Sequence, residues 1–388
     1  MSTTSRTSAE FDPKLSIRTR DLHASPIREI LSVIDRPGMI SFAGGLPAVD
    51  TFPKFSLTDM PQEVLQYGAS EGDWPLREKI AADLADIGLS CSPEQVLILS
   101  GSQQGIDMVA KLFIDAGTPV AVESPTYLAA LQVFRFYGAR FVPFNAQQAD
   151  AALFNAEKPA FAYSIPTFQN PSGRCLSATE RTALAQACDT SHTPLFEDDP
   201  YRDLVYDACD RSPVCALLQN APWIYQGSFS KSLAPGLRLG YMVASPALLP
   251  MLTRLKQAAD LHSNRMSQWL VLQQLNNPSR KTELTTLANH YRQRRDAFET
   301  ALQRHFGDLA TWEKPPGGLF FWLTLNRCID TRRVLPLAIE QGVAFMPGEP
   351  FLPFETTGCG QLRLNFSHAN EVQADEGLHK LAALIRHI

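Results

Sequence analysis

Two stretches decide the fold: PLFEDDP at residues 194–200 and WIYQGSFSK at residues 223–231. Each begins as a short apolar run with aromatic or β-branched residues and ends in polar side chains, a pattern typical of a buried strand followed by a turn. Five similar runs occur in the same region: VLILSG (96–101), PVAVESP (119–125), FVPF (141–144), AFAYSIP (160–166) and LGYMVAS (239–245). Helical patterns alternate with these runs. The alternation predicts an α/β fold with a mostly parallel sheet and helices on both of its faces.

The segments that follow predict a second, smaller unit. Residues 246–305 carry long amphipathic patterns, which predict helices. After Gly307 the pattern changes to shorter strands and helices, which predict a smaller α+β domain. Its expected strands are GGLFFWLTL (317–325), GVAFMPGEPF (342–351) and QLRLNFS (361–367). We expect three parts: an N-terminal arm and helix at 1–48 that joins the small domain, a large domain at 49–285 and a small domain at 286–388.

Composition limits the classes of protein. Of the 388 residues, 45% are hydrophobic and 19% are charged, which is typical of a globular chain. The net charge of −5 disfavours nucleic acid as a partner, because phosphate binding requires a basic surface. No apolar run is long enough to span a bilayer, and the N-terminus lacks the apolar core of a secretory signal. The seven cysteines are scattered without a CxxC pair, which predicts neither a metal site nor a disulfide framework. We therefore expect a cytoplasmic protein without a membrane partner.

The strongest chemical signal lies at the end of the run at 223–230. Lys231 follows two hydroxyl residues, Ser228 and Ser230, and Arg238 lies seven positions further on. In parallel sheets, ligands bind beyond the carboxyl ends of the strands. Hydroxyls and a guanidinium suit a phosphate, and a lysine near other cations has a lowered pKa and can form a Schiff base. The alternative is an ordinary solvated loop lysine.

Two other strand ends carry polar residues, and each has a structural alternative. The sequence SGSQQG at 100–105 offers a glycine turn and a helix N-terminus, which suit an anion but also an ordinary turn and cap. Three acids end the run at 194–200, and carboxylates are costly to bury unless they are paired. We expect Asp199 to cap a helix before Pro200, which leaves Asp198 to meet a buried cation.

Three further residues remain open to two interpretations. Asn170 begins NPSG, which is an ordinary turn sequence. Tyr127, at another strand end, is placed either to pack or to stack on a ring. Arg363 lies between apolar residues of an expected strand, where it either meets a carboxylate in a bidentate pair or faces outward.

Together these motifs resemble a known family. The order SGSQQG, SPTY, NPSG, EDDPY, SFSK, PGLRLGY and LRLNFS resembles the fold-type I, pyridoxal-phosphate-dependent aminotransferases of class I/II along roughly residues 25–380. MISFAGGLP and SPIREIL resemble the α-aminoadipate/kynurenine aminotransferase branch, which also includes broad-specificity, aromatic and branched-chain enzymes. The resemblance implies a large domain with a mostly parallel seven-stranded sheet, a smaller α+β domain, pyridoxal 5'-phosphate (PLP) as cofactor and a homodimer.

The resemblance also implies roles for the matching residues. Lys231 resembles the Schiff-base lysine, and Asp198 resembles the carboxylate that pairs with the ring nitrogen. Those two residues and Tyr201 are the implied catalytic set. The other implied cofactor contacts are Ser102, Gln103, Tyr127, Asn170, Tyr201, Ser228, Ser230 and Arg238, with Tyr67 reaching the phosphate of the neighbouring subunit. The implied substrate contacts are Gly45, Asn170, Arg363 and Arg28, the last of these on an N-terminal helix that is mobile in this branch.

The function that the resemblance implies is transfer of an amino group from an L-amino acid to a 2-oxo acid such as 2-oxoglutarate, by a ping-pong mechanism. We expect a donor of the aminoadipate, aromatic or branched-chain type. Apolar Leu46, Leu128 and Phe366 favour aromatic or aliphatic side chains, whereas Arg28 favours an acidic one. NPSG in place of the commoner NPTG, and Leu128 after Tyr127, depart from the family pattern and leave the substrate open.

Two alternatives remain at this stage. One is a PLP-dependent lyase or decarboxylase on the same scaffold. The other is an aminotransferase-like regulatory domain. Such regulators carry an N-terminal DNA-binding winged helix, and we expect the roughly 25 residues before the matching region to be too few for that module.

Overall fold

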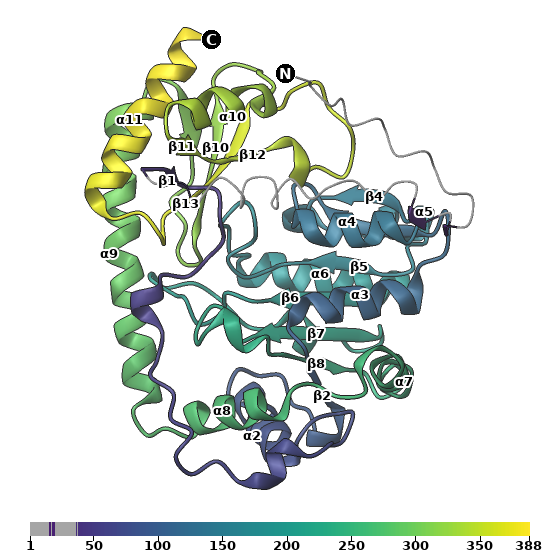
Figure 1. Ribbon diagram of the computed structural model, residues 1–388. Helices are drawn as coiled ribbons and strands as arrows, with labels where there is room; N and C mark the ends of the chain where they lie inside the picture. The colour runs from purple at the N-terminus through teal and green to yellow at the C-terminus, as the bar shows by residue number, and fades with distance from the viewer. Residues whose placement is uncertain (1–14, 17, 20–35, 37) are drawn as a thin grey trace.

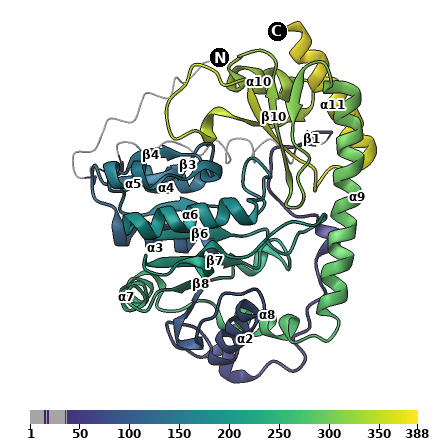
Figure 2. The same ribbon diagram turned by 180° about the vertical axis from the view of Figure 1, so that it is seen from behind.

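The computed structural model describes residues 15, 16, 18, 19, 36 and 38–388. The expected N-terminal helix with Arg28 lies outside these residues. The described chain forms a larger part around a seven-stranded sheet and a smaller part around a four-stranded sheet. The long helix α9 (Arg280–Phe306) runs beside both parts, as Figures 1 and 2 show from opposite sides.

The seven-stranded sheet is mostly parallel, which confirms the prediction from the alternating runs. In spatial order its strands are β2 (Val96–Leu99), β8 (Gly240–Ala244), β7 (Trp223–Ser228), β6 (Leu195–Asp199), β5 (Ala162–Ser164), β3 (Pro119–Glu123) and β4 (Arg140–Phe144). Only β8 is antiparallel to its neighbours β2 and β7. The carboxyl ends of the other six strands therefore lie at one edge of the sheet.

Helices cover both faces of this sheet because its strands are apolar on both sides. In β2, Leu97 and Leu99 pack on one face, whereas Val96 and Ile98 pack on the other. The helices whose side chains join the first face are α3 (Ser102–Phe113), α4 (Leu128–Phe136) and α7 (Leu249–Asp260). Those that join the second are α2 (Trp74–Ala85), α5 (Ala151–Glu157), α6 (Ala178–Ser191) and α8 (Arg265–Leu275).

The smaller part has its own antiparallel sheet and apolar core. Its strands, in spatial order, are β12 (Met346–Pro347), β13 (Gln361–Asn365), β10 (Phe320–Leu325) and β9 (Ala310–Trp312). A separate parallel pair joins β1 (Ile40–Ser41) to β11 (Val343–Ala344), and the helices are α10 (Thr331–Glu340) and α11 (Glu371–His387). The N-terminal segment thus pairs with a strand from near the C-terminus.

The run at 342–351 differs from the single strand that its sequence predicts. It forms two two-residue strands, β11 and β12, which belong to different sheets. Phe345 between them is fully buried, so the chain changes sheets at a core residue. The sequence pattern also missed β9, a three-residue edge strand that is too short to show a period.

Two properties of the described residues bear on partners. None of their helices combines the length and the apolarity that crossing a bilayer requires. The same residues contain no group of three or more His, Cys, Asp or Glu side chains placed to hold a metal ion.

Candidate active site

A cavity of about 290 Å³ gathers most of the residues singled out from the sequence. It is lined by Ser102, Gln103, Tyr127, Ile165, Asn170, Asp198, Pro200, Tyr201, Ser228, Ser230, Lys231 and Arg238. These residues follow, or lie at, the carboxyl ends of strands from the seven-stranded sheet. The fold therefore brings together side chains that are more than a hundred positions apart, at the edge where open α/β sheets bind ligands.

Lys231 is a buried amine held by one main-chain contact. Its Nζ donates a hydrogen bond to the carbonyl oxygen of Gly45 at 2.8 Å. Burial lowers the pKa of Lys231 to about 8, and the positive charges of Arg363 and Arg238 act in the same direction on this pKa. The amine is therefore neutral far more often near neutral pH than a surface lysine, and a neutral amine is a nucleophile and a base.

Asp198 is a buried carboxylate held from both sides. Tyr163 donates to its Oδ2 at 2.8 Å, and the Gln226 side-chain amide donates to its Oδ1 at 3.0 Å. Burial raises the pKa of Asp198 to about 6, although these two hydrogen bonds oppose the rise. A cation placed in the cavity beside this carboxylate would stabilise its charged form.

Sequence analysis missed both partners of Asp198. Gln226 could have been found, because a polar residue inside the apolar run at 223–228 indicates a buried polar contact. Tyr163 left no such signal, because tyrosine is common in strands for packing alone.

The turn between β2 and α3 brings Arg238 close to a helix N-terminus. Gly101 adopts a positive φ of +84°, and a side chain there would collide with the Arg238 guanidinium. Only glycine allows this approach without strain. The twelve-residue helix α3 begins at Ser102, so its free N–H groups face the same space as Arg238. A helix N-terminus and a guanidinium together favour a doubly charged anion.

Arg363 is a fully buried guanidinium without a carboxylate partner among the described residues. It donates to Asn170 Oδ1 at 2.8 Å and to the carbonyl oxygen of Ala43 at 2.8 Å, and its Nε has no partner in the described protein. The ring centroids of Phe320 and Phe351 lie 4.1 and 5.0 Å, respectively, from the guanidinium carbon of Arg363. Burial lowers the pKa of Arg363 to about 10, so the group stays charged and lacks a counter-ion. Asn170 lines the cavity together with Tyr201 and thereby links Arg363 to it.

Some predicted residues lie apart from this cavity. Tyr67 is 76% exposed and packs edge-to-face on the ring of His262, with the centroids 5.7 Å apart. Arg28 lies outside the described residues. Leu128 and Phe366 are buried among core side chains and do not line the cavity, whereas Leu46 is 45% exposed.

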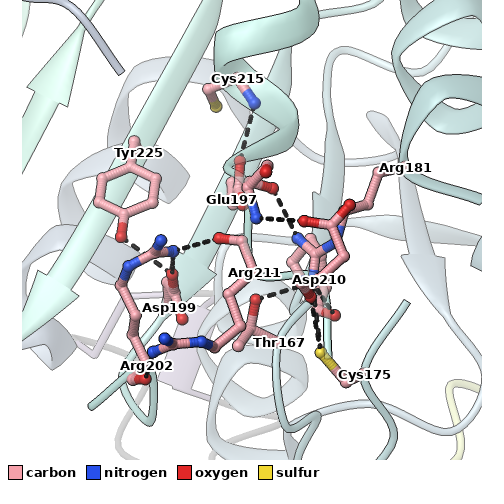
Figure 3. Close-up of polar contacts among 12 residues, drawn as sticks. Thr167, Cys175, Arg181, Glu197, Asp199, Arg202, Asp210, Arg211, Cys215 and Tyr225 are labelled. Atoms are coloured by element: carbon pink, nitrogen blue, oxygen red, sulfur yellow. Dashed lines mark hydrogen bonds and ion pairs between the residues drawn. The ribbon is translucent and has the colours of Figure 1, made fainter. Parts of the chain in front are cut away.

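The expectation that Asp199 caps a helix is wrong. Asp199 is the last residue of β6, and its Oδ2 accepts hydrogen bonds from Tyr225 at 2.9 Å and from Arg202 at 3.0 Å (Figure 3). No helix begins after it, because Pro200 and Tyr201 form a turn. The buried ion pair instead fixes the end of the strand that carries Asp198.

Comparison with known proteins shows the family to which the chain belongs. Residues 42–381 match the family model of aminotransferase class I and II. Aromatic-amino-acid aminotransferase 1 from Thermococcus litoralis is 34% identical, over 97% of this chain and 95% of the relative. The crystal structure of Pyrococcus horikoshii kynurenine aminotransferase in complex with PMP is 33% identical with a TM-score of 0.89, over 96% of this chain and 97% of that one. The α-aminoadipate aminotransferase of Thermus thermophilus, complexed with N-(5'-phosphopyridoxyl)-L-leucine, is 35% identical with a TM-score of 0.86, over 96% of this chain and 97% of that one.

Proposed function

The chain belongs to the class I and II aminotransferases, which are PLP-dependent enzymes acting on amino acids and 2-oxo acids, and from this premise we propose its substrates and the role of each site residue. The proposed donor is an L-amino acid of the aromatic, aminoadipate or branched-chain type. The proposed acceptor is a 2-oxo acid such as 2-oxoglutarate, and the two half-reactions share one site.

One observation carries the assignment of roles. A single cavity holds the amine of Lys231, the carboxylate of Asp198 and, where Arg238 lies beside the N-terminus of α3, a place that favours an anion. These are the groups that PLP requires, since it has a carbonyl, a ring nitrogen that can be protonated and a phosphate. Gly101 leaves room for Arg238 beside the start of α3, which fits the phosphate. The cavity residues therefore fit PLP.

The phosphate would be held by the N-terminus of α3 at Ser102 and Gln103, by Ser228 and Ser230, and by Arg238. Tyr127 would lie on the ring face, and Tyr201 and Asn170 would donate to the phenolic oxygen. Asp198 would keep a proton on the ring nitrogen, because its negative charge stabilises the positive one.

When bound, PLP supplies the carbonyl that exchanges the amino group and a ring that withdraws negative charge from the substrate Cα. Lys231 supplies the base: its neutral Nζ takes the proton from Cα and keeps it inside the cavity. Burial of this amine favours the reaction, because the neutral form is the one that accepts a proton. Lys231, Asp198 and Tyr201 are the proposed catalytic residues.

The substrate carboxylate is assigned to Arg363, with Asn170 and Gly45 beside it. The support is the unpartnered Nε of a fully buried guanidinium, which is stabilised by an anion. Fixing the carboxylate fixes which bond at Cα faces the base, so Arg363 selects proton loss over other bond cleavages.

A panel of amino donors tests the substrate class. With 2-oxoglutarate present, we expect aromatic, 2-aminoadipate and branched-chain donors to give the highest kcat/KM, because the similar proteins described above are named for aromatic amino acids, aminoadipate and kynurenine. The measurement is 2-oxo acid and glutamate formation for each donor. Product formation that does not depend on the 2-oxo acid would instead identify a lyase or decarboxylase.

We also propose a homodimer in which Tyr67 reaches the phosphate of the partner's site. Large apolar side chains are exposed along the segment 57–74, namely Leu57, Leu65, Tyr67 and Trp74, and at Leu261, next to the His262 on which Tyr67 packs. Arg265 fixes the segment before α2, because it donates to Asp73 at 2.8 Å and to the Gln66 carbonyl at 3.2 Å. A rigid segment with exposed apolar side chains suits a subunit interface.

Mixing two variants, each impaired in a different residue of the proposed shared site, tests this interface. Tyr67→Ala should weaken cofactor binding, and Lys231→Ala should abolish turnover. If Tyr67 acts across the interface, a mixed dimer contains one site with both wild-type residues, so dissociating and reassociating an equal mixture should restore up to about a quarter of wild-type activity. The measurement is turnover before and after subunit exchange. A mixture that stays inactive while the subunits demonstrably exchange would place Tyr67 in its own subunit's site or in none.

The division into parts at 1–48, 49–285 and 286–388 is likewise a proposal. The pairing of β1 with β11 supports the assignment of the N-terminal segment to the small domain. The proposed boundary at 285/286 lies inside α9, which continues through it without a break. The expected cytoplasmic location and the absence of a nucleic-acid partner stay predictions.

A further inference from the structure

A fully buried arginine joins two loops behind the active site. Arg181 of α6 donates from its guanidinium to the carbonyl oxygens of Pro166 at 3.0 Å and Leu176 at 2.9 Å, which flank the turn that carries Asn170. It also donates to the carbonyls of Asp210 at 3.0 Å and Ser212 at 2.8 Å, in the segment that follows Tyr201 (Figure 3). Carbonyl oxygens accept these hydrogen bonds, and the positive charge of Arg181 also favours the ionised forms of the nearby Glu197 and Asp210 carboxyl groups.

Two thiols meet beside this guanidinium. Arg181 Nη2 lies 3.4 Å from the Cys175 sulfur, and that sulfur lies 3.1 Å from the carbonyl oxygen of Asp210. Cys209 directly precedes Asp210, and its thiol lies close enough to that of Cys175 for each to act on the pKa of the other. Both cysteines also pack against the same apolar core. The loops that Arg181 joins therefore hold the two thiols near each other.

The two thiols differ in acidity. The hydrogen bond from Cys209 lowers the pKa of Cys175 to about 7, the positive charge of Arg181 acts in the same direction, and burial opposes both. The same contact raises the pKa of Cys209, because a thiolate there would face the charged sulfur of Cys175. Such an asymmetry separates an attacking thiolate from a thiol that stays protonated.

Cys175 is also accessible from outside the protein. It lines a surface pocket of about 130 Å³ together with Ser172–Arg174 of the same loop and Glu313–Pro316 of the smaller part. A small oxidant such as hydrogen peroxide fits this volume. None of these pocket residues belongs to the active-site cavity.

We propose that Cys175 and Cys209 form an oxidation site, at which hydrogen peroxide converts the two thiols into an intramolecular disulfide. The Cys175 thiolate attacks one peroxide oxygen, the O–O bond breaks and hydroxide leaves, which gives a sulfenic acid on Cys175. The Cys209 sulfur then attacks the Cys175 sulfur, the S–O bond breaks, and water leaves with the proton of the Cys209 thiol. Two thiols are oxidised, and one peroxide is reduced to water in total.

The disulfide would join the loop of Asn170 to the segment after Tyr201. Both residues line the active-site cavity, so the covalent bond would join two segments that form its wall. The site is independent of the proposed substrates, because it uses no residue of the catalytic set.

The experiment treats the holoenzyme with stoichiometric hydrogen peroxide and maps the product without reduction. Trypsin cleaves after Arg174, Arg181, Arg202 and Arg211, so a disulfide joins the peptide of residues 175–181 to the peptide of residues 203–211. We expect this linked pair as the main product, the loss of two hydrogen atoms from the intact mass, and full reversal by dithiothreitol. At pH 7 the reaction should be about tenfold faster than that of an ordinary exposed thiol, because the lowered pKa of Cys175 leaves more of this thiol ionised.

Three single variants make the test decisive. In Cys209→Ser, Cys175 should accumulate as a sulfenic acid that a 1,3-diketone probe labels. In Cys175→Ser, Cys209 should stay reduced. Cys328→Ser, which removes an exposed cysteine outside this pair, should leave the linked peptide unchanged. Oxidation of Cys328 while Cys175 stays reduced, or absence of the linked peptide from the oxidised native enzyme, would overturn the proposal.

Discussion

Replacing Lys231 with alanine is expected to abolish the visible absorbance of the holoenzyme and to lower kcat by about 10⁴-fold. Lys231 is the only amine that lines the cavity of the described protein, and its lowered pKa of about 8 leaves it neutral more often near physiological pH than a surface lysine. Without it, the cofactor would have no lysine in this cavity to hold its carbonyl, and the substrate Cα would lack the proposed base. The measurements are the absorption spectrum of the purified protein with added PLP and the steady-state rate.

Lys111→Ala is the matched control, because Lys111 lies on the exposed surface of α3 and pairs only with Asp107 in the described structure. It should keep both absorbance and turnover. Adding a small primary amine to Lys231→Ala should restore part of the rate, since a free amine can enter the space left by the side chain. Full turnover by Lys231→Ala without any added amine would refute the assignment.

Asp198→Asn is expected to lower kcat by about 10³-fold while leaving the fold intact. Asparagine keeps the shape of the side chain and can still accept from Tyr163 or Gln226, but it removes the negative charge that would hold a proton on the ring nitrogen. The loss should therefore appear in kcat more than in the KM for the amino donor. The measurements are single-turnover rates of the donor half-reaction and the thermal unfolding temperature.

Asp115→Asn is the control for Asp198→Asn, because Asp115 lies in an exposed turn at the end of α3. It should leave the rate unchanged. If Asp198→Asn lost only cofactor affinity and regained the wild-type rate at saturating PLP, Asp198 would act in binding rather than in charge stabilisation.

The sequence predicts well those features that depend on local pattern. Apolar runs ending in polar residues predict the strands, and the order of the motifs predicts which strand ends meet. The cavity gathers Ser102, Asp198 and Lys231 accordingly, because parallel strands bring their carboxyl ends to one edge.

Features that depend on contacts between distant buried residues are not visible in the sequence. Tyr163 holds Asp198 from a neighbouring strand, and a tyrosine in an apolar run looks like a packing residue. Arg181 looks like an ordinary polar position of an amphipathic helix, yet it is fully buried among carbonyl oxygens from two loops. The contact between Cys175 and Cys209 escapes a search for regular spacing for the same reason: folding, not sequence proximity, brings the two together.

The unbroken helix α9 links the two parts of the enzyme. Its 27 residues contain neither glycine nor proline, so no residue within it favours a kink. The helix extends for about 40 Å alongside both parts. Any rotation of the part that carries Arg363 relative to the part that carries Lys231 would therefore turn about α9 or bend the connections outside this helix. Replacing two adjacent exposed residues near the middle of α9 with glycine would weaken this helix as a link between the part that carries the amine and the part that carries the guanidinium, without touching either group.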